Sequence, residues 1–565
     1  MAALPVVSPR EARGNKSALS ARPAFAAPRP GVRLPLSPRE RVLLAALLLG
    51  AVLMRVAVIW MPSDQMLEFG NLPFEEVLRG NAAFDFQHGT LLPVLDYQLN
   101  QFSGGSLVVS LIAVPLFVLA APLFPVLRLV SLCFSIPLVL LTFVLVDRWV
   151  GRRGAWTAAG LIAFAPPGYQ FLNCTVYGTH LEGNLVMVGL VFLYLSWREA
   201  ARTGWKRTAG LGLASGLAVW FGYGQCAVLG VLLLVELASS GPKSVLRRAP
   251  PFALGLVVGL SPWIANALRH PDRALNIYDR SIAEHFTLSS ILDQRSAAFG
   301  NLFVVDGPRS FWFNGVDPSA GMLIAHVFFW GIVLLFGCCL WIERGQIAAF
   351  TRALAGREAR FDPSLRLMTL LFIATWLCLF GLSDLRLLSS ESVLGCRYLM
   401  PLFPFIAILA GTAVEDSPTR RLRATGIAVI VLVTTVNAAG TIAQLRPDRL
   451  ASHAQAPATS TAWHVRMIVR RFGNDPEAMS NILVRIDAKR AEPERTQLVD
   501  WIAKCLASIA ASPPEPVRDG SLDLRPFAET LSFLAEHAPE SQRPAFRREF
   551  ATLQATGSAL EAAGH

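Results

Sequence analysis

A group of acidic side chains follows the first long apolar stretch of the chain. The segment Ser63–Asn81 reads SDQMLEFGNLPFEEVLRGN, and its charged residues are Asp64, Glu68, Glu75, Glu76 and Arg79. A carboxylate near a membrane face can accept a proton, because partial burial adjusts its pKa. The alternative is that these carboxylates cap and solubilise a helix lying along the membrane. We expect the last two glutamates to form a solvated helix face.

Polar side chains recur at later points between the apolar runs. Arg397 and Tyr398 stand at the mouth of a late run, where the fork of an Arg matches phosphate oxygens and stays charged. Snorkelling Arg and interfacial Tyr are also common there for structural reasons. His88 offers a hydrogen bond in the first loop. His180 and Glu182 form a polar turn, in which helix capping and a local ion pair are equally good explanations.

Composition shows which elements must position these residues. The chain has 565 residues, of which 53% are hydrophobic and 16% charged, and its mean hydropathy is +0.46. Soluble domains carry about 25% charged residues, so the class is an all-α, polytopic helical membrane protein. The net charge of +11 comes from Arg in short loops, which is typical of cytoplasmic loops and indicates membrane lipids, not nucleic acid, as partners.

The basic clusters set the predicted orientation. About eleven transmembrane helices place these clusters inside, the N-terminus in the cytoplasm and the C-terminus outside the cytoplasmic (inner) membrane. The helices are expected at Val42–Met61, Val126–Val146, Ala155–Phe171, Asn184–Trp197, Ala209–Tyr223, Cys226–Ala238, Phe252–Leu268, Met322–Trp341, Leu367–Leu382, Tyr398–Val414 and Ile427–Ile442.

The domain organisation follows from the same pattern. Residues 1–41 are predicted to be a disordered basic cytoplasmic tail, and residues 42–444 a transmembrane domain. Within that domain, 62–125 is a first outer loop of interfacial helices with a re-entrant or interfacial segment. A long outer loop, 270–319, is aromatic enough to fold over a cleft, and it contains Asp279. Residues 445–565 are expected to form a small helical outer region.

Four local features, in this order, resemble the glycosyltransferase-C superfamily. The first span carries Arg55 and opens into the acidic loop EFGNLPFEEVLRGN. The segment PVLRLVSL leads to a span ending in DRWVGRRGAWTAAGLIAFAPPGY. A late span begins RYLMPLFPFIAILAG. These enzymes, such as protein mannosyltransferases and aminoarabinose transferases, take a sugar from a polyprenyl phosphate. The match covers roughly residues 42–440, although Gln65 and Met66 stand where many members have an Asp-Glu pair.

The resemblance implies a membrane glycosyltransferase at the outer face of the cytoplasmic membrane. It would move a sugar, with inversion, from a polyprenyl-phosphate donor to a glycolipid, glycan or protein acceptor. No cofactor is implied, no metal-ligand set is evident, and assistance by a divalent metal stays open. The resemblance implies three residue roles. Asp64 or Glu68 would be the carboxylate base, and Arg397, Tyr398 and His88 would bind the donor phosphate. The sugar or acceptor would be contacted by His180, Glu182 and Asp279.

Two other functions stay open at this point. A non-catalytic, lipid-binding or scaffold protein of the same fold would explain the missing acidic pair and the missing Lys in QHGTLLPVLDYQ. A transporter or lipid flippase would need ionisable residues at mid-membrane, whereas those of this chain gather in outer loops. The most informative observation would be whether a polar cavity joins Asp64 or Glu68 to Arg397.

Overall fold

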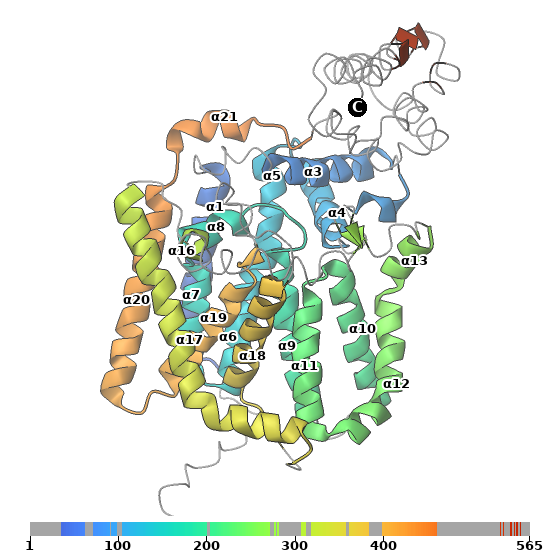
Figure 1. The fold of residues 1–565 in the computed structure, drawn as a ribbon. Coiled ribbons are helices and arrows are strands. Elements are labelled where there is room, and N and C mark those ends of the chain that lie inside the picture. Colours follow the sequence, from blue (N-terminus) through green and yellow to red (C-terminus); the bar gives the residue numbers. More distant parts are fainter. Residues whose placement is uncertain are drawn as a thin grey trace, which may run out of the picture.

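The structure is a computed structural model of the chain. It describes residues 35–62, 72–90, 92–98, 104–200, 204–269, 307–311, 318–357, 361–382 and 398–459, with single residues and short pieces within 271–281 and 532–554. Helices dominate this part, so the predicted all-α class is confirmed (Figure 1). A two-residue antiparallel pair, β1 (Asn276–Ile277) and β2 (Arg280–Ser281), is also present.

There are eighteen α-helices in the described parts of the chain. They are α1 (Pro38–Trp60), α3 (Leu72–His88), α4 (Gly104–Leu119), α5 (Phe124–Arg128), α6 (Leu132–Trp149), α7 (Arg152–Ala163), α8 (Pro167–Asn173), α9 (Glu182–Glu199), α10 (Trp205–Phe221), α11 (Gln225–Ser240), α12 (Pro242–Gly259), α13 (Ser261–Arg269), α16 (Gly307–Phe311), α17 (Pro318–Leu354), α18 (Leu365–Leu382), α19 (Leu402–Glu415), α20 (Arg420–Ala443) and α21 (Leu450–Ala454). Short 3-10 turns lie at η1 (Val94–Tyr97), η2 (Leu129–Ser131) and η7 (Pro447–Arg449).

Several helices have the length and apolar character of membrane spans. Within the described residues there are four, Pro38–Trp60, Phe124–Trp149, Gly321–Leu354 and Arg420–Ala443. The pair α12 and α13, bent by 57° at Leu260, makes up to five. The chain is therefore a multi-pass membrane protein, and the total of about eleven spans stays a prediction.

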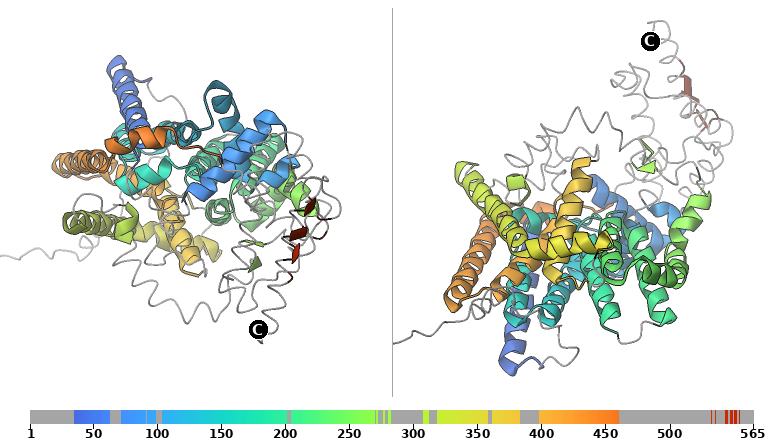
Figure 2. Two further views of the ribbon diagram at one scale, coloured as in Figure 1. Left: turned by 90° about the horizontal axis from the view of Figure 1, so that it is seen from above. Right: turned by 60° about the horizontal axis from the view of Figure 1, so that its bottom comes forward.

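The bundle has two distinguishable ends. Arg152 at the start of α7 forms an ion pair with Glu40 at the start of α1, with Nη1 and Oε1 3.4 Å apart. The start of α1 therefore lies beside the α6–α7 turn, and α1 and α6 run in opposite directions. Figures 1 and 2 show α3 and α21 lying across the other end of the helices. We name these the α3 end, which is predicted to be outside, and the opposite end.

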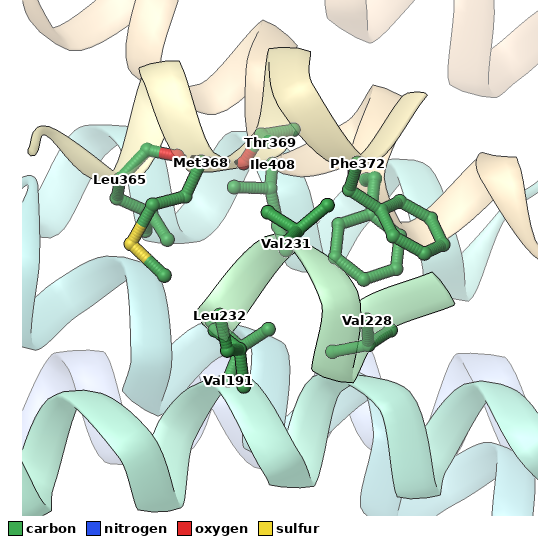
Figure 3. A pocket seen from close by; sticks show the side chains of 10 residues that line it. Val191, Val228, Val231, Leu232, Leu365, Met368, Thr369, Phe372 and Ile408 are labelled. Atoms are coloured by element: carbon green, nitrogen blue, oxygen red, sulfur yellow. Dashed lines mark hydrogen bonds between the residues drawn. The ribbon is translucent and has the colours of Figure 1, made fainter. Parts of the chain in front are cut away.

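The core is tightest where α7 meets α19. A Cβ added to Gly154 would lie 2.7 Å from Gly411 O, and one added to Gly411 would lie 2.5 Å from Gly154 O. Only glycine permits such an approach of two backbones. A small space also remains between α9, α11 and α18, lined by Val191, Val228 and Phe372 (Figure 3). Its volume of about 10 Å³ is marginal for one water, so this region is packed core.

Two predicted spans are broken in the described part of the structure, and one of them, Phe252–Leu268, bends by 57° between α12 and α13. Ala155–Phe171 was expected to be continuous, but α7 ends at Ala163 and α8 begins at Pro167. Pro166 and Pro167 lack the N–H groups that would continue the helix. Arg55 of α1, which is fully buried, donates to the last carbonyls of α7, with Nη2 3.1 Å from Ile162 O and Nη1 3.3 Å from Ala163 O. This intramembrane charge therefore caps a half-helix.

The helix α17 is longer than its predicted span. Met322–Trp341 was expected, whereas the helix extends from Pro318 to Leu354. Figure 1 shows its C-terminal part lying across the opposite end of the bundle. That part carries Glu343, Arg344 and Arg352 among apolar residues, a mixture suited to a membrane surface.

Candidate functional site

The acidic side of α3 is buried at the α3 end, which corrects the expected solvated face. Glu76 is 0% exposed and forms an ion pair with Arg128 of α5. Nε and Nη2 of Arg128 lie 2.9 and 2.6 Å from its two carboxylate oxygens. The backbone N–H of Val176 donates to the same carboxylate at 3.1 Å. Glu75, its neighbour, lies at the edge and contacts Arg79 at 3.5 Å.

The next charged residue of α3 binds the same backbone segment. Nη2 of Arg79 donates to Tyr177 O at 2.5 Å and to Ser106 Oγ of α4 at 3.1 Å. Glu76 and Arg79 are three residues apart and therefore share a helix face. Together they bind backbone groups of two consecutive residues, Val176 and Tyr177, in the polar turn, which we define as residues 174–182.

The polar turn brings one pair of predicted residues together. Gly178 adopts a left-handed φ of +84°, and a Cβ there would lie 2.6 Å from Ser106 Cα. Two residues later, the ring of His180 meets that of Tyr398 edge to face, with ring centroids 4.9 Å apart. Tyr398 was predicted to bind donor phosphate and His180 to contact sugar or acceptor, so the two predicted subsites adjoin.

The Glu182 carboxylate is buried and has no side-chain hydrogen-bond donor in the described part of the chain. The residue begins α9, in the polar turn, and is 2% exposed. Burial raises the pKa of this carboxyl to about 7, although the backbone of Glu182 and Gly178, and then the Arg79 guanidinium, favour the charged form. A carboxyl that titrates near neutral pH can exchange a proton or bind a sugar hydroxyl.

The other predicted site residues are placed elsewhere or lie outside the described residues. His88 is exposed at the end of α3, where its Nδ1 lies 2.9 Å from Phe84 O and its ring contacts the Phe84 ring. No hydrogen bond or ring contact joins it to the polar turn among the described residues. Four candidates lie outside the described residues: Asp64, Glu68, Asp279 and Arg397.

An apolar groove opens between α17, α19 and α20. Its volume is about 710 Å³, and it extends from Leu323 and Phe403 towards Ser417 and Gly426 near the opposite end. Two of its walls, α17 and α20, are candidate membrane spans, so the groove borders the bilayer. Phe403 lines the groove and is five residues after Tyr398, whose ring contacts His180 of the polar turn, so the groove and the turn are linked through this short segment.

A segment after α20 returns across the α3 end. We define it as the strap, residues 445–459. Its His453 lies with Nε2 3.2 Å from Nη1 of Arg128 and stacks on Phe124 at 6.4 Å between ring centroids. Ala458 N donates to Pro122 O at 2.8 Å. Burial, and then the nearby Arg128 guanidinium, lower the pKa of His453 to about 4, so its ring is neutral and accepts from Arg128.

The site holds no evident metal centre. Among the described residues, no group of three or more His, Cys, Asp or Glu side chains is arranged to hold an ion. What the sequence did not predict is the pairing of Glu76 with Arg128, which stand 52 residues apart. The one available signal was Arg128 itself, a lone charge inside the otherwise apolar stretch from Leu107 to Val146.

Comparison with known proteins identifies structural similarities only. No protein-family model matches the chain, and no curated protein sequence matches it. The chain is similar to the crystal structure of ArnT from Cupriavidus metallidurans bound to undecaprenyl phosphate, with 16% identity over 79% of this chain and 74% of that one, and a TM-score of 0.48. It is also similar to the archaeal oligosaccharyltransferase AglB from Archaeoglobus fulgidus in complex with an inhibitory peptide and a dolichol-phosphate, with 12% identity over 78% of this chain and 59% of that one, and a TM-score of 0.38.

Proposed function

We propose that this protein is a membrane glycosyltransferase that takes a sugar from a polyprenyl-phosphate donor at the α3 end. The observation that carries the proposal is Glu182, a buried carboxylate to which no side chain among the described residues donates a hydrogen bond. It stands in the same turn as His180, whose ring contacts Tyr398. A buried carboxylate is unfavourable unless it binds something, and a sugar or acceptor hydroxyl supplies the missing donor.

The apolar groove supports a lipid-linked donor over a water-soluble one. Its walls are almost entirely hydrocarbon, with Leu323, Ile324 and Val327 on the α17 side. A polyprenyl chain lying there would leave its phosphate and sugar at the end nearest Tyr398. The headgroup would then meet the polar turn, and Arg397, next to Tyr398 in the chain, would supply the cation that phosphate needs.

The proposed reaction is an inverting transfer. The acceptor hydroxyl oxygen attacks the anomeric carbon, and the bond from that carbon to the phosphate oxygen breaks. The hydroxyl proton passes to a carboxylate, for which Asp64 is the first candidate and Glu68 the second, and polyprenyl phosphate leaves. Arg397, Tyr398 and His88 are proposed to stabilise the phosphate. His180, Glu182 and Asp279 are proposed to contact the sugar or acceptor.

The proposal is tested by donor cleavage in proteoliposomes. Release of polyprenyl phosphate from a panel of polyprenyl-phosphate sugars is measured with crude envelope lipids and glycans as acceptors. Asp64→Asn is expected to lower the rate by at least ~10²-fold, the loss typical of a general base. Glu182→Gln is expected to lower it roughly 10- to 100-fold, through loss of a hydrogen bond to a charged group.

A matched control lies on the same helix as Glu182. Glu199 ends α9 at the opposite end and pairs with Arg148, so Glu199→Gln should retain the wild-type rate. Absence of cleavage by the wild type with every donor would refute the transferase. Lipid binding in that case would support the scaffold function.

A further inference from the structure

We infer that Glu76 and Arg79 are positioning residues that set the location of the polar turn, and with it the location of His180 and Glu182. The inference rests on the proposed function for its kinetic readout. It concerns how the first predicted outer loop is coupled to the site, and it assigns these two residues no contact with substrate.

Two charges of opposite sign bind backbone groups of two consecutive residues in the turn. The Glu76 carboxylate accepts from Val176 N at 3.1 Å, and the Arg79 guanidinium donates to Tyr177 O at 2.5 Å. Both side chains are buried, at 0% and 3% exposure. Hydrogen bonds to charged groups are the strong ones, and they are stronger away from water. A bond at each end of one short segment restrains both its position and its rotation.

The backbone of α4 supports the turn from the side. A Cβ added to Gly105 would lie 1.6 Å from Gly178 O, so the two segments are in direct backbone contact. Ser106 accepts from Arg79 at 3.1 Å. The turn is therefore held between α3 and α4, and a displacement of α3 must be transmitted to it.

The consequence for the site follows from chain connectivity. His180 is three residues after Tyr177, and its ring centroid is 4.9 Å from that of Tyr398. Glu182 follows two residues later. A displacement of about 1 Å in a group that orients a reacting substrate can cost ~10²-fold in rate. Loss of either bond to the turn should therefore reduce turnover without removing any group that touches the substrate.

A purely structural role makes a different prediction. Replacement of a buried ion pair by apolar residues of similar volume is often neutral for stability. Leu at both Glu76 and Arg128 would therefore retain the packing of α3 on α5. It would still remove the only acceptor that the structure shows for Val176 N–H, within the described residues. This double variant separates the stability of the ion pair from the positioning of the turn.

The experiment compares three forms of the full-length protein in proteoliposomes. For Glu76→Leu/Arg128→Leu we expect thermal unfolding close to that of the wild type, kcat for donor cleavage lower by ~10²-fold, and an unchanged KM for the donor. Glu75→Gln is the matched control, because it changes the adjacent carboxylate on the same helix, and we expect it to retain kcat.

A second readout does not depend on activity. Cysteines replacing His180 and Tyr398 are joined by a short bis-maleimide, and the linked peptide is quantified by mass spectrometry. We expect efficient linkage in the wild-type and Glu75→Gln backgrounds, and a lower yield with Glu76→Leu/Arg128→Leu. Unchanged linkage and unchanged kcat in that variant would overturn the inference. If the wild type cleaves no donor, the proposed function fails, whereas the linkage yields still decide whether α3 positions the turn.

Discussion

The two ends of the bundle hold buried charges in different ways. At the opposite end, Arg366 donates to Glu343 Oε1 at 3.2 Å, to Thr412 Oγ1 at 3.1 Å and O at 2.9 Å, and to Asp416. Glu236, also at that end, accepts from Arg248, Ser240 and Tyr194. Glu343 and Glu236 are buried and have donors, as buried charges normally do, whereas Asp416 is exposed.

The α3 end combines a satisfied carboxylate with an unsatisfied one. Glu76 accepts two hydrogen bonds from the Arg128 side chain and one from Val176 N–H, whereas no side chain among the described residues donates to Glu182. Both are buried in the same region, so burial alone does not distinguish a structural carboxylate from a reactive one. The number of side chains that donate hydrogen bonds to the carboxylate does distinguish Glu76 from Glu182. The comparison indicates that the opposite end stabilises the helices, and that the α3 end retains a group available to a ligand.

The largest expected effect is on stability at the opposite end. Arg366→Leu leaves Glu343 and Asp416 without their shared donor, and breaking a buried pair in this way costs about 3–5 kcal/mol. We expect a clear fall in the temperature of unfolding, followed by intrinsic fluorescence in detergent, with donor cleavage per folded molecule unchanged. A loss of specific activity in the folded fraction would contradict the division between the two ends.

Substitution of Glu182 should lower activity without lowering stability, which is the reverse of the result expected for Arg366→Leu. The folded pKa of Glu182, about 7, lies above the ordinary value of 4.5. Between these values the unfolded carboxyl is ionised and the folded one is not, so wild-type stability declines as pH rises from 4.5 to 7. Glu182→Gln should remove that decline, and it should unfold at a higher temperature than wild type at pH 8 but at the same temperature at pH 4.

Although Glu182→Gln should be more stable than the wild type at pH 8, its rate of donor cleavage should be lower. Donor cleavage by the wild type is expected to rise as the pH passes through about 7, because the ionised carboxylate is the stronger acceptor. In Glu182→Gln this rise should be absent and the rate roughly 10- to 100-fold lower. A less stable variant with full activity would show that Glu182 is structural, as Glu236 is.

The smallest effect concerns the strap. The folded pKa of His453 is about 4, below its ordinary 6.5, so docking is strongest above pH 6.5 and weakens as pH falls towards 4. We expect amide exchange at Phe124 and Ala458, corrected for intrinsic rate, to lose about ten-fold protection between pH 7 and 5.5. His453→Phe should retain the stacking on Phe124 and show no such pH dependence. An identical dependence in that variant would refute this assignment.

Local sequence patterns predicted most of the fold. Apolar length indicated α1 and α20 to within a few residues at their apolar ends, because a membrane span is specified by its own composition. Misplaced boundaries came where flanking residues continue a helix beyond the apolar stretch, as at the end of α17. Pro166 was a signal in the sequence for a helix break, although the predicted span continued through it. The carbonyl groups at the end of α7 could be assigned a hydrogen-bond donor only from the structure, which places Arg55 beside them.

The site was less predictable, because its key contacts join distant parts of the chain. The polarity of His180 and Glu182 identified the turn. However, Tyr398, whose ring meets that of His180 edge to face, lies 218 positions further along the chain. A helical pattern also cannot distinguish Glu75 from Glu76. One contacts its own helix and the other meets Arg128, and the difference arises only from the packing of α3 on α5.

Arg55 has a consequence for how the chain enters the membrane. Its two acceptors in α7 are synthesised 107 and 108 residues after it. At about 5–20 residues per second, translation reaches them roughly 5–20 s later. Throughout that interval α1 has left the ribosome with a guanidinium that lipid cannot solvate. We therefore expect α1 to stay in contact with the translocation channel or with water until α7 is inserted, so that α1 completes its packing only after α7 has been made.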